Sequence, residues 1–392
     1  MAGQPVGRRN WKLETRNSKL ETRDWKLVSS FQFMCSAALV CAILLFSFGP
    51  GLSKLGRLFG YNPEQDDVNN APVADKWETT PIHWQIDPTI GSNVHTTGGA
   101  TVQTAVNNAF NAWQSAQVNG QTLTNIAFTK DPNTSQTDPD SSDCLNTVLF
   151  ASSSKTTFPM GVIAFTDVAF TSVPSGVSPP ITYDCTTPPT MRMCNLDACI
   201  VDADIVFNPG EAFSTTTPTL SGDFDVQSTV THEIGHLLGL DHSGIANAIM
   251  YPFGDTTSTG QPRVLAIDDA VGVAFLYPSS NFASATGTIS GQVTLSGSGI
   301  FAAHVIAIDA ASGNAVVDGL TDTSGKYNLV GVPPGNYDVL ALPLVGIYDL
   351  SHFGGWACGY ESVNSPPCCD PTEPTCNGTE LKPPTNYTGK FH

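Results

Sequence analysis

Hydrophobic and polar positions between residues 76 and 280 follow two periods. Ile82 to Ile86 alternates with the period of a strand, whereas apolar residues over 102–113 and 225–238 recur at helical spacing. A last helix is expected from Ile267 to Leu276, with two acidic residues in its first turn. Further short strands are expected at 125–128, 147–150, 161–165 and 201–207. These elements predict one α/β domain over residues 76–280.

The pattern changes near residue 280. Residues 279–288 are rich in Ser, Ala, Thr and Gly and are expected to be a linker. From Gly287 to about Pro343, short alternating runs are separated by turn residues, which predicts a small all-β sandwich over 281–345. Residues 346–392 form a Cys/Pro-rich tail.

The N-terminus carries a targeting signal. Residues 1–26 are basic, and Phe31 to Phe48 is a long apolar run without charge. Such a run enters a membrane or an export channel, and the basic flank keeps the N-terminus cytoplasmic. Two alternatives stay open for residues 27–51, a cleaved signal peptide or a retained membrane anchor, followed by a linker over 52–75. The rest is expected to be extracellular, either secreted or tethered to the membrane.

Charge and cysteine content narrow the class of protein. The 392-residue chain has 17 Lys+Arg against 35 Asp+Glu and a net charge of −18, which excludes nucleic acid as a partner. Its 10 cysteines fall into three even groups. The clusters in loop-like sequence are expected to form disulfides in an oxidising compartment, the competing interpretation being a cysteine zinc site. The middle group contains Cys144, Cys185, Cys194 and Cys199.

One segment, Thr231 to Pro252, carries the candidate chemistry. On a helix, His232 and His236 lie one turn apart on the same face, so both imidazoles can bind one metal ion. Glu233 lies beside the first ligand, where its carboxylate can hold a zinc-bound water and take its proton. Apolar residues of the helix fall on the opposite side and can pack against a sheet: Val226, Val230, Ile234, Leu237 and Leu238.

The residues after this helix complete a three-histidine site. Gly239 is expected to end the helix in the left-handed conformation, so that the chain turns and His242 becomes a third ligand. Three protein ligands leave a position for water, which is typical of catalytic rather than structural Zn²⁺. HExxH alone also occurs in ordinary amphipathic helices. HExxHxxGxxH followed by Met250 is a far more specific pattern and predicts zinc-dependent peptide hydrolysis.

These residues resemble the matrixin branch of the metzincin zinc metalloproteases. The likeness includes His242-Ser243, Ala248 to Pro252, the strand from Gly161 and the segment from Asp202 to Asn208. It implies a five-stranded mixed sheet with a zinc-bearing active-site helix, and a Met turn in which Met250 lies beneath the metal. It also implies a protein or peptide substrate that binds along the edge strand and above the segment after Met250. The implied substrate-binding residues are Gly161, Val162, Ile163, Ala164, Tyr251 and Pro252.

The C-terminal module resembles the carboxypeptidase-regulatory-like, transthyretin-like sandwich, on Gly291 to Val293, Thr321 to Tyr327 and Pro333 to Tyr337. The resemblance implies a spacer or adhesion unit, and peptide hydrolysis is expected to persist without residues 281–392. No ligand role is expected for the remaining histidines, which include His304. The matrixin latency pattern around a pro-segment cysteine has no counterpart between residues 52 and 76.

Two further functions compete with extracellular proteolysis. One is a surface adhesion protein whose protease-like domain only docks partners, and the other is zinc-dependent cleavage of a cell-wall amide. Calcium is a second candidate metal, since Asp138, Asp140 and Asp143 lie together in one loop. The competing interpretation of that loop is a solvated acidic segment without the spacing of a calcium site.

Overall fold

The structure is a computed structural model that describes residues 74–150, 156–172, 177–178, 180–187, 191–196, 198–256, 262–322 and 324–344. It also gives the backbone of short strands at 6–10, 13–15, 65–68, 71–73 and 390–391. The apolar run from Phe31 to Phe48 and the last four cysteines lie outside these residues. Within the described part of the chain, no helix has both the length and the apolar character needed to cross a membrane.

A mixed sheet of five strands forms the centre of the α/β region, residues 76–280. The strand order is β9-β12-β8-β5-β7, in which β9 is antiparallel to β12 and the other neighbours are parallel. This arrangement agrees with the predicted five-stranded mixed sheet, although β9 and β12 are longer than expected. The strands are β5 (Ile82–Asp87), β7 (Phe128–Lys130), β8 (Thr147–Leu149), β9 (Val162–Ser172) and β12 (Ala198–Phe207).

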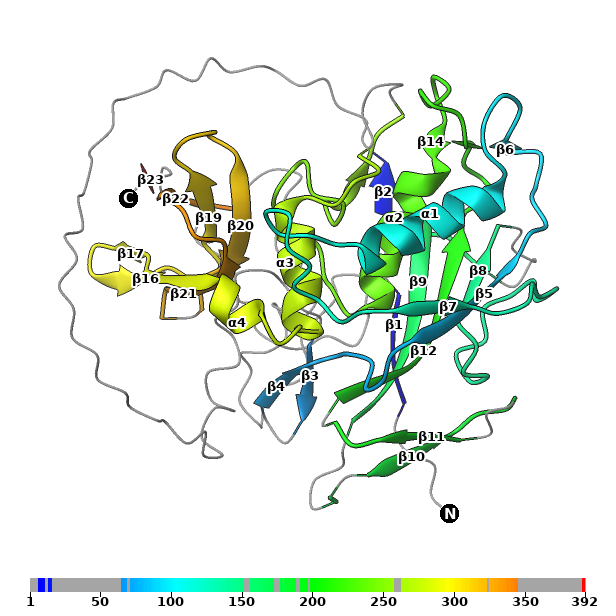
Figure 1. Cartoon of the computed structure of the whole chain (residues 1–392), viewed down its shortest axis with the longest axis horizontal. Coiled ribbons are helices and arrows are strands. Elements are labelled where there is room, and N and C mark those ends of the chain that lie inside the picture. The colour runs from blue at the N-terminus through cyan, green and yellow to red at the C-terminus, as the bar shows by residue number, and fades with distance from the viewer. Residues whose placement is uncertain are drawn as a thin grey trace.

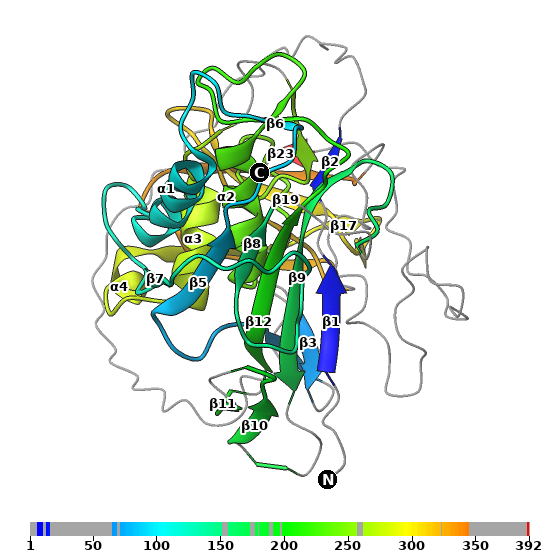
Figure 2. The same ribbon diagram turned by 90° about the vertical axis from the view of Figure 1, so that its right-hand side faces the viewer.

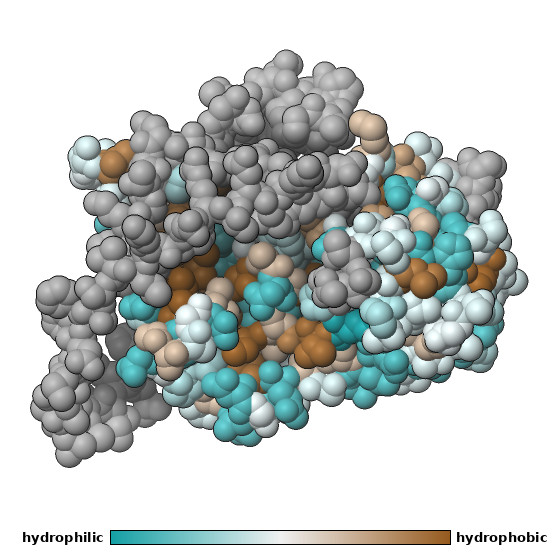
Figure 3. Space-filling view, turned by 90° about the horizontal axis from the view of Figure 1, so that it is seen from above, coloured by the Kyte–Doolittle hydropathy of each residue, from teal (hydrophilic) through white to brown (hydrophobic). Residues whose placement is uncertain are grey.

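Helices α1 (Val102–Gln114) and α2 (Val226–Leu237) pack together on one face of this sheet (Figures 1 and 2). The indole N–H of Trp113 donates to the carbonyl of Thr231 at 2.7 Å, which ties α1 to α2 inside the core. Trp84 of β5 stacks on Phe110 of α1, with ring centroids 4.0 Å apart. Seen from above, the coloured part of the surface mixes hydrophilic and hydrophobic residues (Figure 3). The apolar residues of α1 are buried, among them Val106 and Trp113. The apolar side of α1 therefore faces inward, as its spacing predicted.

The segment between β9 and β12, which carries cysteines of the middle group in loop-like sequence, contains a hairpin. Strands β10 (Ile181–Asp184) and β11 (Met191–Cys194) pair antiparallel. Disulfides join Cys144 to Cys185 and Cys194 to Cys199, which confirms that this cysteine group forms disulfides, with a connectivity that the sequence left open. A second small sheet, in the order β14-β13-β6, lies before α2. Its strands are β6 (Val94–His95), β13 (Phe213–Ser214) and β14 (Phe224–Asp225).

Strands from the N-terminal segment extend the central sheet at β9. Strand β1 (Val6–Asn10) pairs antiparallel with β9 from Asp167 to Thr171. Strand β2 (Leu13–Thr15) lies between β9 and β15 (Phe253–Gly254), antiparallel to the first and parallel to the second. The sequence analysis, by contrast, expected residues 1–26 to stay cytoplasmic and the α/β region to be exported. Strands β3 (Gln65–Val68) and β4 (Ala71–Ala74) form a separate hairpin.

The C-terminal β region, residues 287–344, packs against helix α3 (Ile267–Leu276), which separates it from α1 and α2 (Figure 1). The segment expected to be a linker instead contains a short helix, α4 (Phe282–Ala285). It is not an open linker because the side chain of Phe282 is buried in the main hydrophobic core. The strands are β16 (Gly287–Gln292), β17 (Thr294–Leu295), β18 (Ser298–Gly299), β19 (His304–Asp309), β20 (Ala315–Leu320), β21 (Lys326–Val332), β22 (Tyr337–Leu342) and β23 (Lys390–Phe391).

These C-terminal strands pair in three groups. Strand β16 pairs with β21, and β17 with β18. A four-stranded sheet has the order β20-β19-β22-β23, with antiparallel neighbours. Apolar residues of this region belong to one continuous core with the α/β region. The two regions are therefore joined through a shared hydrophobic interior.

Candidate metal centre

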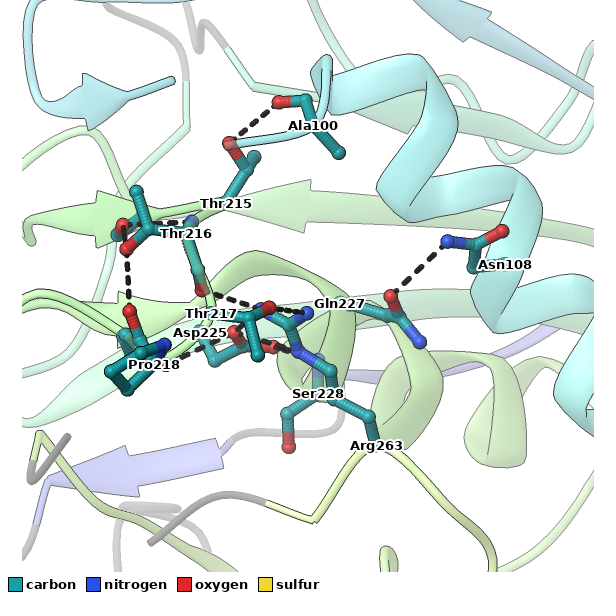
Figure 4. Close-up of polar contacts among 12 residues, drawn as sticks. Ala100, Asn108, Thr215, Thr216, Thr217, Pro218, Asp225, Gln227, Ser228 and Arg263 are labelled. Atoms are coloured by element: carbon teal, nitrogen blue, oxygen red, sulfur yellow. Dashed lines mark hydrogen bonds and ion pairs between the residues drawn. The ribbon is translucent and has the colours of Figure 1, made fainter. Parts of the chain in front are cut away.

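The first turn of α2 is fixed by a buried carboxylate. Asp225 caps the helix, its Oδ1 accepting from the main-chain N–H of Ser228 at 2.7 Å. The Arg263 guanidinium forms an ion pair with this carboxylate and also donates to the carbonyl of Thr216 at 2.8 Å (Figure 4). A negative charge at a helix N-terminus interacts favourably with the helix dipole. This end of the site helix is thus anchored before the histidines begin.

Two histidines on α2, His232 and His236, point their Nε2 atoms toward each other. Nδ1 of His232 lies 2.7 Å from the carbonyl of Ile249, and Nδ1 of His236 lies 2.8 Å from the carbonyl of Leu240. A carbonyl only accepts, so both Nδ1 atoms donate and the neutral rings keep their Nε2 lone pairs for a ligand. The two Nε2 atoms are 3.0 Å apart. Burial lowers the pKa of His232 to about 4, which favours this neutral form.

His242 completes the group from the turn after α2. Its ring centroid lies 5.2 Å from that of His232 and 4.9 Å from that of His236, and one nitrogen of each ring lies within 4.8 Å of the others. The turn depends on Gly239, whose φ of +88° is the predicted left-handed conformation. A Cβ at this position would meet the carbonyl oxygen of Asp75 at 2.1 Å.

Met250 lies directly under the helix that carries the histidines. A Cβ on Gly235 would meet its sulfur at 2.1 Å, so the glycine in HExxH makes room for this side chain. The Met turn is held by hydrogen bonds from several sides. The N–H groups of Ile249 and Met250 donate to Asp269 at 2.9 and 3.0 Å, and the N–H of Ser243 donates to the carbonyl of Met250 at 2.8 Å.

Glu233 is buried next to the histidines. The hydroxyl of Thr166, on β9, lies 2.7 Å from its Oε2 and 3.0 Å from its main-chain carbonyl. Its Oε1 has no hydrogen-bond partner among the described residues. Burial raises the pKa of Glu233 to about 8, while the hydrogen bond from Thr166 acts in the opposite direction. A carboxyl with one oxygen anchored and the other available suits proton transfer.

These donors fit a zinc ion. Nitrogens that share a tetrahedral Zn²⁺ at about 2.0–2.1 Å lie roughly 3.3 Å apart, close to the 3.0 Å between the two helix imidazoles. Three neutral imidazoles are a usual ligand set of catalytic zinc, and the carbonyls behind two of them fix their orientation. The cysteines found near Glu78 are paired in a disulfide and so are not available as thiolate ligands.

The predicted substrate-binding residues lie on two segments that flank β2. Val162, Ile163 and Ala164 are buried on β9, and Gly161 precedes the strand with a φ of +88°. Tyr251 and Pro252 lead into β15, and the Tyr251 ring meets Phe253 edge-on at 5.6 Å. The space between β9 and β15 therefore accepts an extended chain, which here is β2.

The candidate calcium residues differ in burial. Asp140 uses its Oδ1 to bind Ser142 within the loop, whereas Asp143 is buried beside Asp202 and Asp204. Burial and neighbouring negative charge raise the pKa of Asp202 well above its usual value. Asp202 lies against the Asp143 carboxyl, with the Cys144 N–H as a weaker hydrogen-bond donor.

Sequence reasoning missed three residues that support the site: Thr166, Arg263 and Asp269. The first follows a predicted strand, and its hydroxyl reaches Glu233 across 67 positions. The second reaches Asp225 across 38 positions. The third was placed in the first turn of a helix but not connected to the Met turn. A polar residue inside an apolar strand was the signal available for Thr166.

An α/β fold that holds three imidazoles beside a buried glutamate is the architecture of a zinc hydrolase centre. Residues 195–278 match the family model described as matrixin, a peptidase family. Metalloendoproteinase 2-MMP of Arabidopsis thaliana is 40% identical over 103 residues, covering 26% of this chain and 26% of that protein. Karilysin of Tannerella forsythia is 45% identical over 53 residues, covering 14% of this chain and 10% of that protein.

Metalloendoproteinase 5-MMP of Arabidopsis thaliana is 41% identical over 92 residues, or 23% of each chain. The chain spans about a quarter of the length of the two plant relatives that it matches. Within that span, the matches support a matrixin-like zinc metalloendopeptidase.

Proposed function

We propose that this protein is an exported zinc-dependent endopeptidase. The observation that carries the proposal is the convergence of the Nε2 atoms of His232 and His236, 3.0 Å apart, with His242 and the buried Glu233 beside them. Export is supported by the apolar run after a basic N-terminus and by the disulfides of the α/β region. The proposed enzyme is therefore extracellular, either secreted or tethered to the membrane.

In the proposed reaction, His232, His236 and His242 hold Zn²⁺, and Glu233 transfers protons. When bound, zinc supplies a Lewis acid that acidifies a water molecule and polarises the scissile carbonyl. Glu233 takes a proton from the attacking water and delivers it to the leaving amine. Thr166 holds one oxygen of Glu233, so the carboxylate stays aimed at the reacting water. Met250 supports the helix from below and is not a metal ligand.

The substrate is proposed to be an extended protein or peptide. It would pair antiparallel with β9 at Val162 and Ala164, and Tyr251 and Pro252 would contact the residue after the scissile bond. The support is the position of β2, which makes both ladders that this binding mode requires. Residues 1–26, which contain β2, are proposed to stay cytoplasmic or to be cleaved on export, so the exported enzyme would leave this position to a substrate.

Two finer assignments belong to the same proposal. The C-terminal β region is proposed to be the small β-sandwich that its turn residues indicated. Calcium is proposed as a second metal near Asp143, where the buried Asp202 would gain a compensating positive charge. A rise in the melting temperature on adding Ca²⁺, absent from Asp202→Asn, would support this site.

Hydrolysis of a quenched generic peptide by the purified protein tests the proposed activity. A chelator should abolish cleavage. Glu233→Ala should lower kcat by about 10²–10⁴-fold with zinc retained, because the carboxylate serves as base and not as ligand. Glu211→Ala, a partly exposed glutamate, is the matched control and should keep wild-type activity. A zinc-loaded protein that cleaves nothing but binds a surface partner would favour the adhesion function instead.

A further inference from the structure

A carboxylate from the C-terminal β region reaches the turn that carries the third histidine. Asp318 is the single charged residue of β20 and is almost fully buried. Its Oδ2 accepts from the main-chain N–H of Gly244 at 2.7 Å, and the hydroxyl of Ser243 lies 3.5 Å from its Oδ1. These two residues directly follow His242. The contact thus joins the two regions at the edge of the metal centre.

His304, on β19, fixes this carboxylate from the other side. Its Nε2 lies 2.6 Å from Oδ2 of Asp318, the oxygen that also accepts from Gly244. A Cβ at Gly244 would come within 2.2 Å of His304 Nε2 and 2.4 Å of Asp318 Oδ2. The glycine is therefore needed for the close approach, and the contact is a packed one rather than a loose surface pair.

The main chain of Asp318 makes a second connection to the site. Its N–H donates to Oδ1 of Asp268 at 3.2 Å, in the first turn of α3. The next residue, Asp269, accepts from Ile249 and Met250 of the Met turn. Because Ser243 in turn donates to the carbonyl of Met250, the hydrogen bonds form a closed circuit that includes β20, α3 and both turns below the metal.

Apolar packing keeps β20 in place against α3. Both sides of β20 are buried, and Val317 is fully buried in the same core as Val271 and Val273 of α3. A Cβ at Gly331 of β21 would meet Val271 at 2.4 Å, so these strands approach the helix closely. The carboxylate of Asp318 is thus presented by a rigid element, as a precise contact requires.

We propose that Asp318 is a positioning residue for the metal centre and that the C-terminal β region belongs to the active unit. Asp318 acts through the Ser243–Gly244 turn to hold His242 at the angle that the other two imidazoles require. This inference rests on the proposed function for its catalytic meaning. It replaces the expectation that residues 281–392 are a dispensable spacer, because their removal would release the turn after the third ligand.

Three full-length variants test the role of Asp318. Asp318→Ala removes both acceptor oxygens, whereas Asp318→Asn can keep the oxygen that faces Gly244 and His304. Val317→Ala is the matched control, since it weakens the packing of the same strand without touching the turn. For each, we would measure zinc affinity by chelator competition, the melting temperature, and hydrogen exchange of the Gly244 amide in metal-free protein.

Asp318→Ala should weaken zinc binding by about 10–100-fold relative to Val317→Ala and should speed exchange at Gly244. Asp318→Asn should restore most of the affinity and protection. Equal zinc affinity and equal exchange in Asp318→Ala and Val317→Ala would overturn the inference, whatever the melting temperatures. Both readouts are independent of peptide cleavage. A protein that responds as expected but hydrolyses no peptide would therefore contradict the proposed function and leave the positioning role established.

Discussion

Two groups of buried carboxylates in this protein have opposite surroundings. Next to the metal centre, Asp269 accepts hydrogen bonds from the main-chain N–H groups of Ile249, Met250 and Ala266. On β12, inside the sheet, Asp204 accepts from two N–H groups, whereas its neighbour Asp202 lies against the Asp143 carboxyl and has the Cys144 N–H as a weaker donor. Both groups are fully buried, so burial alone does not determine what a carboxylate does.

The difference lies in the donors. A buried carboxylate that accepts several N–H bonds has its lost hydration replaced, and in return it fixes the main chain around it. A buried carboxylate with too few donors takes up a proton or binds a cation. Asp269 therefore organises the Met turn, whereas Asp202 is a candidate for protonation or calcium binding.

Removing the carboxylate of Asp269 should have the largest effect on the free energy of unfolding. Asp269→Ala leaves three main-chain N–H groups without their acceptor, and the expected loss is about 3 kcal/mol or more in the free energy of unfolding. Zinc affinity should fall as well, since the carbonyl of Ile249 orients His232. Denaturant unfolding with and without zinc measures both. Asp338→Ala, at an exposed position of β22, should behave as wild type.

Replacing Asp202 should have a smaller effect on the free energy of unfolding, and this effect should depend on pH. Because the pKa of Asp202 is raised on folding, wild-type protein loses stability as the pH rises from the unfolded value through the folded one. Asp202→Asn cannot ionise and avoids this loss. The stability difference should favour the variant increasingly with pH, by at most about 1.4 kcal/mol per pH unit in calcium-free buffer. A difference independent of pH would contradict the assignment.

Removing the hydrogen bond to the proposed base should have the smallest effect on stability, about 1 kcal/mol. The hydroxyl of Thr166 lowers the pKa of Glu233, so Thr166→Val should raise it. Since the reaction requires the ionised carboxylate, the acid limb of the kcat/KM profile should move to higher pH. Thr166→Ser, which keeps the hydroxyl, should leave the limb in place. An unchanged limb in the Val variant would show that Thr166 does not act on the base.

Local sequence was sufficient for the chemistry and much of the fold. Helical spacing brings His232 and His236 together within one turn, and the glycine that follows lets His242 return, so no distant information is needed. The helix at Ile267–Leu276 was predicted with its correct bounds. Individual strands were predicted from apolar runs, whereas the five-stranded mixed sheet was implied by the resemblance, and β9 and β12 are longer than predicted.

The supporting contacts could not be predicted because they join residues far apart in the chain. Asp318 and Gly244 are 74 positions apart, and neither lies in a motif. The available signal was a lone carboxylate in the apolar run Ala315–Leu320, which indicates a buried partner without identifying it. His304 was assigned no role because it lacks ligand spacing. Its role is to hold another side chain, which spacing does not reveal.

Zinc K-edge X-ray absorption on the purified full-length protein tests the central claim most directly. Three imidazole nitrogens at about 2.0–2.1 Å, with stoichiometric zinc and no sulfur scatterer, are predicted. The histidine signal should disappear in His236→Ala. Zinc bound to sulfur at about 2.3 Å, or an unchanged histidine signal in that variant, would contradict the proposed centre.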